Sequence, residues 1–191
     1  KFSIESDRVA QKKILDAVTT LESEGYQFEA AEASFELIVR KEIGRHRAFF
    51  ELDHYRVAVH RAGSAAPVTK TTLTLLIDGK EVNASAEGDG PVNALDNGLR
   101  AALLPHYPSL STLRLIDYNV RVVNSTAAPA AKVRVMIEFK SPHGELTTGS
   151  GAQTSSLFGT VGVSGNIIDA SWQALLDGIE YHLLHEAESA R

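Results

Sequence analysis

The stretch LTLLIDGKEVNASAEGDGPV, residues 73–92, carries the signals of two strands, a tight turn and the start of a helix. Apolar residues alternate on both sides of Asp78-Gly79. An Asp-Gly pair in that setting is typical of a type I′ hairpin, in which both central residues need positive φ. The second run ends at Gly88-Asp89-Gly90-Pro91, where proline suits a first helical turn, and apolar residues then recur at helical spacing until Pro105. A hairpin followed by a helix is therefore predicted.

A further strand precedes this hairpin. Tyr55, Val57 and Val59 alternate with more polar residues, as on a half-buried strand, and a loop rich in Gly, Ser, Ala and Pro follows. The predicted unit is a βββα over about 46–105.

The same order of elements recurs over about 109–188. Strands are expected at 118–122, 133–139 and 145–148, and an apolar stripe from Ile168 to Leu183 predicts a closing helix. Short matches support an internal duplication: Tyr55-x-Val57-x-Val59 with Tyr118-x-Val120-x-Val122, and Asn93-x-Leu95-Asp96 with Asn166-x-Ile168-Asp169. We predict an α+β fold, a duplicated βββα domain with helices on one face of antiparallel sheets, whose remaining surfaces are free to pair with a second subunit.

The first part of the chain has a helical rather than a strand period. Helices are expected over about 4–21 and 29–42. We therefore predict a small helical subdomain at 1–44 and an α+β domain at 45–191, for which the family resemblance described below implies the roles of linker and of regulatory dimerisation domain. The chain begins with Lys1 rather than Met, which suggests a piece of a longer protein.

Composition excludes several classes of function. A formal charge of −5 and a pI near 5.8 provide no broad cationic surface, so neither nucleic acid nor a membrane is expected as a partner. The absence of cysteine removes thiolate nucleophiles and cysteine metal sites and fits the cytoplasm. No apolar run approaches the roughly 20 residues that span a bilayer.

Two local features are candidate ligand contacts. The turn Gly88-Asp89-Gly90 precedes a helix N-terminus, whose free N–H groups suit a carboxylate, although a plain strand-to-helix turn explains the same residues. The alternation slips between Leu115 and Tyr118, which predicts a bulge that turns Asp117 and Tyr118 towards a pocket. A buried Tyr beside a solvated Asp is the alternative.

Other features point less clearly to function. Residues 149–165, rich in glycine, suit either a loop that closes over a ligand or an ordinary long connection. The seven histidines show no metal-ligand spacing, and His182 and His185 are interpreted as solvated helix residues. No metal site and no catalytic dyad is predicted, so we expect the fragment itself to be non-catalytic.

Several segments resemble the C-terminal regulatory domain of the 2-isopropylmalate and citramalate synthases. These are Gly88-Asp89-Gly90-Pro91-Val92, the Asp117-Tyr118 strand and, most specifically, GVSGNIIDASWQALLDGIEY at 162–181. The segment YQFEAAEASFEL at 26–37 looks like the helical linker of the citramalate branch, which is therefore preferred.

The resemblance implies a duplicated βββα domain that dimerises and binds the pathway end product as feedback inhibitor. It also implies a catalytic TIM barrel, absent from this chain, that uses a divalent metal to condense acetyl-CoA with a 2-oxo acid, an acyltransferase reaction. No cofactor is expected in the fragment, and its partners would be a second subunit, the barrel of the same chain and a branched-chain amino acid.

The same resemblance implies the effector site. Its expected residues are Gly88, Asp89, Gly90, Leu115, Asp117, Tyr118, Ile167 and Ile168. The effector carboxylate would meet helix N–H groups, its ammonium Asp89 or Asp117, and its side chain Leu115 and Tyr118. Isoleucine is the preferred effector. Leucine sensing in a 2-isopropylmalate synthase, a dimerisation module without an effector and a small stand-alone enzyme are the alternatives.

Overall fold

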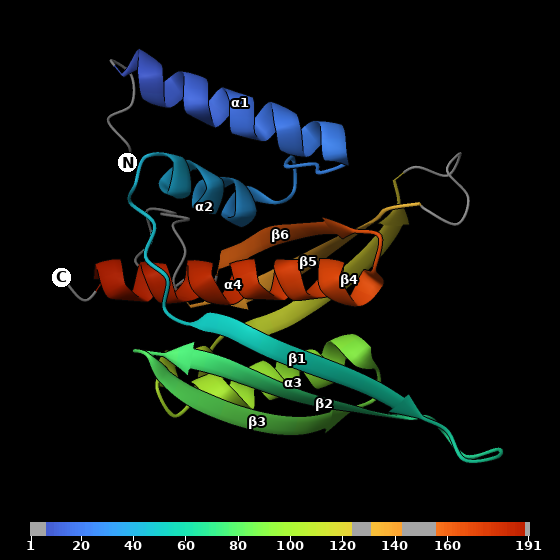
Figure 1. The fold of residues 1–191 in the computed structure, drawn as a ribbon. Helices are drawn as coiled ribbons and strands as arrows, with labels where there is room; N and C mark the ends of the chain where they lie inside the picture. Colours follow the sequence, from blue (N-terminus) through green and yellow to red (C-terminus); the bar gives the residue numbers. More distant parts are fainter. Residues whose placement is uncertain (1–6, 124–130, 143–155, 190–191) are drawn as a thin grey trace, which may run out of the picture. The chain divides into compact units, whose positions relative to one another are not determined.

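The computed structural model describes residues 7–123, 131–142 and 156–189 (Figure 1). It divides into two compact units. The N-repeat unit comprises Ala48–Leu113 with His182–Arg191, and the C-repeat unit comprises Lys1–Arg47 with Arg114–Tyr181. Among the helices in the described ranges, none has the length and apolar character needed to span a bilayer.

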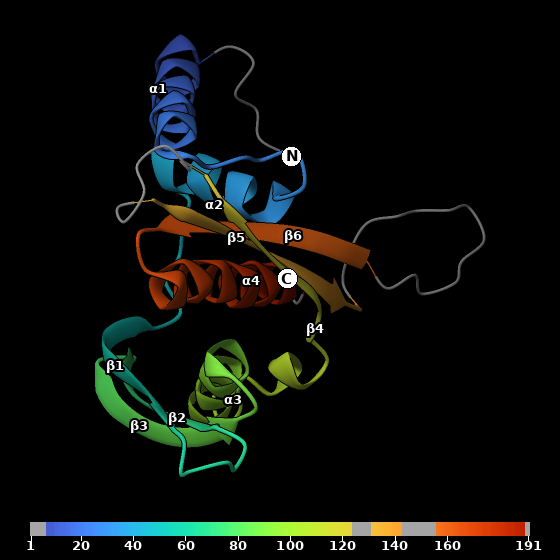
Figure 2. The same cartoon turned by 90° about the vertical axis from the view of Figure 1, so that its right-hand side faces the viewer.

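The N-repeat unit contains the predicted hairpin. Its elements are β1 (Glu51–His60), β2 (Val68–Ile77), β3 (Lys80–Gly88), α3 (Pro91–Leu103) and the short 3-10 helix η1 (Pro108–Ser111). The strands form an antiparallel sheet in the order β1-β2-β3. Asp78 and Gly79 have φ of 50° and 72°, which confirms the hairpin turn. Figure 2 shows α3 along the concave face of this sheet, where it packs mainly on β3 and β2.

The C-repeat unit starts with the linker helices. Helix α1 (Arg8–Glu24) begins after Asp7, whose Oδ1 accepts hydrogen bonds from the amides of Val9 and Ala10 at 3.1 and 3.0 Å. It ends at Gly25, which has a φ of 110°. Helix α2 (Glu32–Glu42) follows. No residue of α1 is buried, whereas α2 buries Ala33, Ser34, Leu37, Val39 and Arg40.

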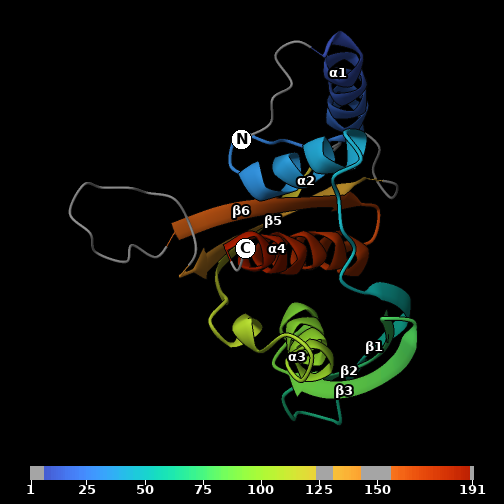
Figure 3. The same cartoon turned by 90° about the vertical axis from the view of Figure 1, so that its left-hand side faces the viewer.

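The second sheet has the order β4-β5-β6 and is also antiparallel. It is formed by β4 (Arg114–Val122), β5 (Val133–Ser141) and β6 (Ser156–Ser164), and is followed by α4 (Ile167–Ser189). Figures 1 and 3 show α2 and α4 against opposite faces of this sheet. The α+β prediction, with two three-stranded antiparallel sheets each followed by a helix, is confirmed.

The prediction for the glycine-rich segment was wrong over its described part, because residues 156–164 form β6 rather than a loop. A Cβ on Gly159 would lie 1.9 Å from the carbonyl oxygen of Ala30, and one on Gly162 would lie 2.0 Å from that of Ala170. Glycine inside a strand often marks such close backbone approach. The strand predicted at 145–148 lies outside the described residues.

A bulge lies at the same place in both repeats. The register shifts between Leu52 and His54 in β1, and between Leu115 and Asp117 in β4, so the unpaired residue lies two positions before Tyr55 and Tyr118 respectively. The sequence match between Asn93-x-Leu95-Asp96 and Asn166-x-Ile168-Asp169 does not correspond to equivalent positions in the two helices. Asn166 directly precedes α4, whereas Asn93 lies inside the first turn of α3, so the two asparagines are not structurally equivalent.

The interpretation of His182 as a solvated residue was also wrong. Only 1% of its surface is exposed, and its Nε2 lies 3.2 Å from the carbonyl oxygen of Ser109, within the N-repeat unit. The apolar stripe of α4 continues around this position, so the side chain turns inwards rather than to solvent.

Candidate effector-binding site

The turn before α3 holds its backbone close to the first turn of the helix. A Cβ on Gly88 would lie 2.5 Å from both the amide nitrogen of Ala94 and Oδ1 of Asn93, so only glycine fits there without movement. Asn93 Oδ1 in turn accepts a hydrogen bond from the Asp89 amide at 3.3 Å.

The N-terminus of α3 has no side-chain cap. Gly90 occupies the N-cap position and Pro91, which lacks an N–H, the first helical position. The following amides are therefore available to an anion, with the positive end of the helix dipole behind them. The carboxylate of Asp89 is exposed beside them. A carboxylate-accepting helix end next to an acidic side chain suits a zwitterion such as an α-amino acid.

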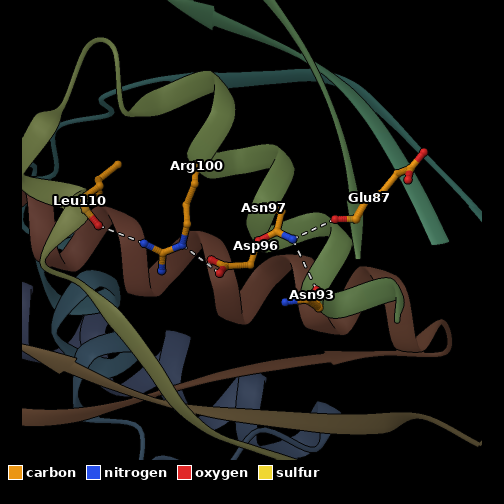
Figure 4. A network of polar contacts seen from close by, with 6 residues as sticks. All are labelled: Glu87, Asn93, Asp96, Asn97, Arg100 and Leu110. Carbon is orange, nitrogen blue, oxygen red and sulfur yellow. Dashed lines mark hydrogen bonds and ion pairs between the residues drawn. The ribbon is translucent and has the colours of Figure 1, made fainter. Parts of the chain in front are cut away.

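A polar network on α3 fixes this turn (Figure 4). Asn97 Nδ2 donates to the carbonyl oxygen of Glu87 at 2.9 Å and contacts Asn93 Oδ1 at 3.4 Å, which ties the end of β3 to the helix. One turn further on, Arg100 donates to Asp96 Oδ2 at 2.8 Å and to the carbonyl oxygen of Leu110 at 3.0 Å. The helix end is thus held by bonds that need no ligand.

In the C-repeat unit, Tyr118 is joined to the first turn of α4. Its Oη lies 3.1 Å from Ser171 Oγ, which donates to the carbonyl oxygen of Ile167 at 2.6 Å. Asn166 caps this helix through its Oδ1, which accepts from the Ile168 amide at 2.8 Å. Ile167 is 44% exposed. The structure therefore places Tyr118 against the first turns of α4, the helix that begins with Ile167 and Ile168.

Leu115 and Asp117 lie on opposite faces of the sheet. The bulge aligns Leu115 with Phe139 and Tyr118 with Ile137, so Leu115 and Tyr118 share the face that carries α4. Asp117 is paired with Glu138 and lines a cavity of about 430 Å³ on the other face, together with Gln27 and other linker residues. Asp117 and Tyr118 thus do not line one pocket within this unit.

The remaining predicted residues, Gly88, Asp89 and Gly90, belong to the N-repeat unit, and the other five belong to the C-repeat unit. Sequence reasoning missed Ser171, Asn166 and Asn97. The signal for Asn166 was an asparagine directly before an apolar helical run, which is a typical N-cap pattern. Ser171 and Asn97 carry no comparable signal, because their roles depend on partners on other elements.

Comparison with known proteins identifies relatives along nearly the whole chain. It is 43% identical over 191 residues to the (R)-citramalate synthase of Aquifex aeolicus, covering 98% of this chain and 34% of the relative. The (R)-citramalate synthase of Geobacter sulfurreducens is 44% identical over 177 residues, covering 92% and 31%. The 2-isopropylmalate synthase of Acidimicrobium ferrooxidans is 32% identical over 152 residues, covering 79% and 25%.

The chain thus spans about a third of the length of the citramalate synthases that it matches. Residues 29–183 match the family described as the LeuA allosteric (dimerisation) domain. This range includes α2, both sheets, α3 and most of α4. The chain therefore belongs to the LeuA allosteric (dimerisation) domain family.

Proposed function

We propose that this chain is the regulatory region of a citramalate synthase, and that it binds isoleucine as a feedback inhibitor. The observation that carries this proposal is the extent of similarity. The citramalate synthases align with 92 to 98% of the chain, whereas the 2-isopropylmalate synthases align with 79%.

The geometry supports an amino-acid effector. The uncapped N-terminus of α3 suits the carboxylate, and the exposed Asp89 suits the ammonium group. Of the two aspartates considered, Asp89 is preferred because Asp117 faces away from Tyr118. Within the C-repeat unit by itself, we propose Leu115, Tyr118 and the start of α4 at Ile167 and Ile168 as a second candidate contact surface, suited to a branched side chain.

The direct test is a thermal-stability measurement with isoleucine, leucine and valine. A ligand that binds only the folded state adds about 1.4 kcal/mol at ten times its Kd, which raises the Tm by several degrees for a chain of this size. We expect the shift with isoleucine to be the largest. A larger shift with leucine would assign the chain to leucine sensing. No shift with any of the three amino acids would indicate a dimerisation module that binds no effector.

Tyr118→Ala serves as the site variant in the same assay. It removes the aromatic ring from the sheet face on which α4 packs, and it should strongly reduce the rise in Tm that isoleucine causes. Val68→Ala, at an exposed position on the sheet of the N-repeat unit, is the control and should leave the shift unchanged. An unchanged isoleucine affinity in Tyr118→Ala would remove Tyr118 from the site.

We also propose that the chain forms a homodimer through the first strand of each repeat. On the sheet face that carries the helix, α3 leaves most of β1 uncovered, and α4 leaves most of β4 uncovered. Val59 and Val122 are each 59% exposed there, at the ends of the two Tyr-x-Val-x-Val stripes. Exposed apolar stripes of this kind mark protein interfaces, and the family is described as a dimerisation domain.

Val122→Glu should therefore weaken the dimer at least tenfold, because a carboxylate would be buried against apolar residues of the second subunit. Val68→Glu is the matched control, since Val68 is 49% exposed on the opposite face of its sheet. Sedimentation velocity over a concentration series measures both. Equal dissociation constants for the two variants would place the interface elsewhere.

The condensing reaction itself is assigned to a catalytic barrel outside this chain. A divalent metal is proposed to bind in that barrel. In residues 7–123, 131–142 and 156–189, no group of three or more His, Asp or Glu side chains is placed to hold a metal ion.

A further inference from the structure

Strand β6 is in direct backbone contact with two other elements. Gly159 lies against the carbonyl of Ala30, in the segment that leads into α2, and Gly162 lies against the carbonyl of Ala170 in α4. Residues 159 and 162 have opposite parity, so the two contacts lie on opposite faces of the strand. No side chain separates these backbones, so β6 lies directly between Ala170 of α4 and the linker at Ala30.

Among the described residues, β6 is an edge strand of its three-stranded sheet, and its outer edge is covered by side chains. Its amides point away from β5 at alternate residues. Gly159 N donates to Glu32 Oε1 at 3.3 Å, Val161 N to Ser34 Oγ at 3.0 Å, and Val163 N to Gln173 Oε1 at 3.0 Å. Two of these acceptors belong to α2 and the third to α4, so the edge is shared between the linker and the closing helix.

Gln173 is the point where the three elements meet. Its Nε2 donates to Asp169 Oδ2 in the first turns of α4 at 3.1 Å. Its Oε1 accepts from Val163 N of β6 and from the Tyr26 hydroxyl of the linker, the latter at 2.9 Å. Burial raises the pKa of Tyr26, so its hydroxyl stays protonated and remains a donor near neutral pH.

The linker around Tyr26 is fastened to the sheet independently of α4. Arg134 donates to the carbonyl oxygen of Gly25 at 2.6 Å and to Gln27 Oε1. Tyr26 and Phe28 pack on a small cluster of Ala31, Val161 and Val163. The segment is therefore ordered on the C-repeat sheet, and Gln173 joins this ordered segment to α4.

We propose that Gln173 is a positioning residue that couples the first turn of α4 to the linker helices through Tyr26. Where the first turn contacts an effector, as the proposed function holds, this coupling transmits effector binding to the linker. An amide is suited to the role because it donates to Asp169 and accepts from Tyr26 and Val163 at once. Allosteric coupling needs such a connection to favour one arrangement of the linker over another.

The first test measures inhibition of the full-length enzyme at saturating isoleucine. Gln173→Met keeps the length of the side chain and loses the three hydrogen bonds. We expect it to bind isoleucine within about threefold of the wild-type Kd, to keep the basal activity, and to lose most of the maximal inhibition. Tyr26→Phe, which removes one hydroxyl, should act in the same direction with less risk to folding.

Gln27→Met is the matched control, because it removes a linker hydrogen bond that does not involve α4. It should be inhibited like the wild type. Full inhibition of both Gln173→Met and Tyr26→Phe, with isoleucine bound, would overturn the coupling role of Gln173. Absence of isoleucine binding in the wild type would instead reject the proposed effector.

A second test needs no effector. Asn166→Ala removes the cap of α4 and loosens its first turn. We expect this change to accelerate amide hydrogen exchange in residues 26–34 of the full-length protein, with an acceleration at least threefold smaller in the Gln173→Met background. Equal acceleration in the two backgrounds, or none in either, would overturn the proposal whatever the effector is.

Discussion

Replacing Gly162 with alanine should destabilise the chain by about 3 kcal/mol, the upper end of the usual cost of overpacking a core. The new Cβ would lie 2.0 Å from the carbonyl oxygen of Ala170 and 2.9 Å from Cβ of Gln173. The first of these atoms belongs to helix backbone, which cannot rotate away as a side chain can. Either α4 or β6 must shift, and the hydrogen bond from Thr160 Oγ1 to the Ala174 carbonyl at 2.8 Å would be strained with it.

Urea denaturation of the wild type and the variant measures this loss. Gly165→Ala is the matched control. It lies three residues further along, an added Cβ would meet nothing within 4 Å, and its φ is not in the left-handed region. Its stability should stay within about 0.5 kcal/mol of the wild type. A loss below 1 kcal/mol in Gly162→Ala would mean that α4 and β6 separate at little cost.

The sequence predicted the parts of the fold that depend on local chemistry. The Asp78-Gly79 turn and the bulge before Tyr118 each follow from a few neighbouring residues. Strand β6 could not be predicted in this way, because Gly159 is required by the carbonyl of Ala30, which lies 129 residues away in the chain. From the sequence alone, glycines that allow another backbone to approach a strand cannot be distinguished from glycines in a loop.

The candidate site shows the same limit. Tyr118 and Ile167 were expected near each other, and Ser171 joins them in the structure. Asp117 was expected beside Tyr118, but a bulge at Ile116 restores the alternation after it and leaves adjacent residues on opposite faces. The sequence indicated that a bulge occurs, whereas the register of β4 on β5 was needed to decide which side chain faces α4.

Replacing Asp177 with asparagine should stabilise the chain at pH 7 to 8 by up to about 3 kcal/mol. Burial raises the pKa of Asp177 from 3.8 to about 6, against the opposing effect of its hydrogen bond with Ser34 and of the charges on Lys41 and His46. The difference corresponds to about 3 kcal/mol at 1.36 kcal/mol per pH unit. Asparagine keeps a hydrogen-bonding side chain of the same shape at this position and carries no charge to desolvate.

The sign of the pH dependence follows from the raised pKa. The folded state holds the proton of Asp177 more tightly than the unfolded state does, so the protonated carboxyl stabilises the fold fully below about pH 4, and this contribution is lost as the pH rises through about 6. Denaturation at pH 4 and pH 8 should therefore show Asp177→Asn gaining on the wild type only at pH 8. Asp16→Asn, on the exposed surface of α1, should show no such difference. If Asp177→Asn were instead less stable at pH 8, the attraction of the carboxylate to Lys41 would outweigh the cost of its burial, and this charge pair would help to hold α4 to α2.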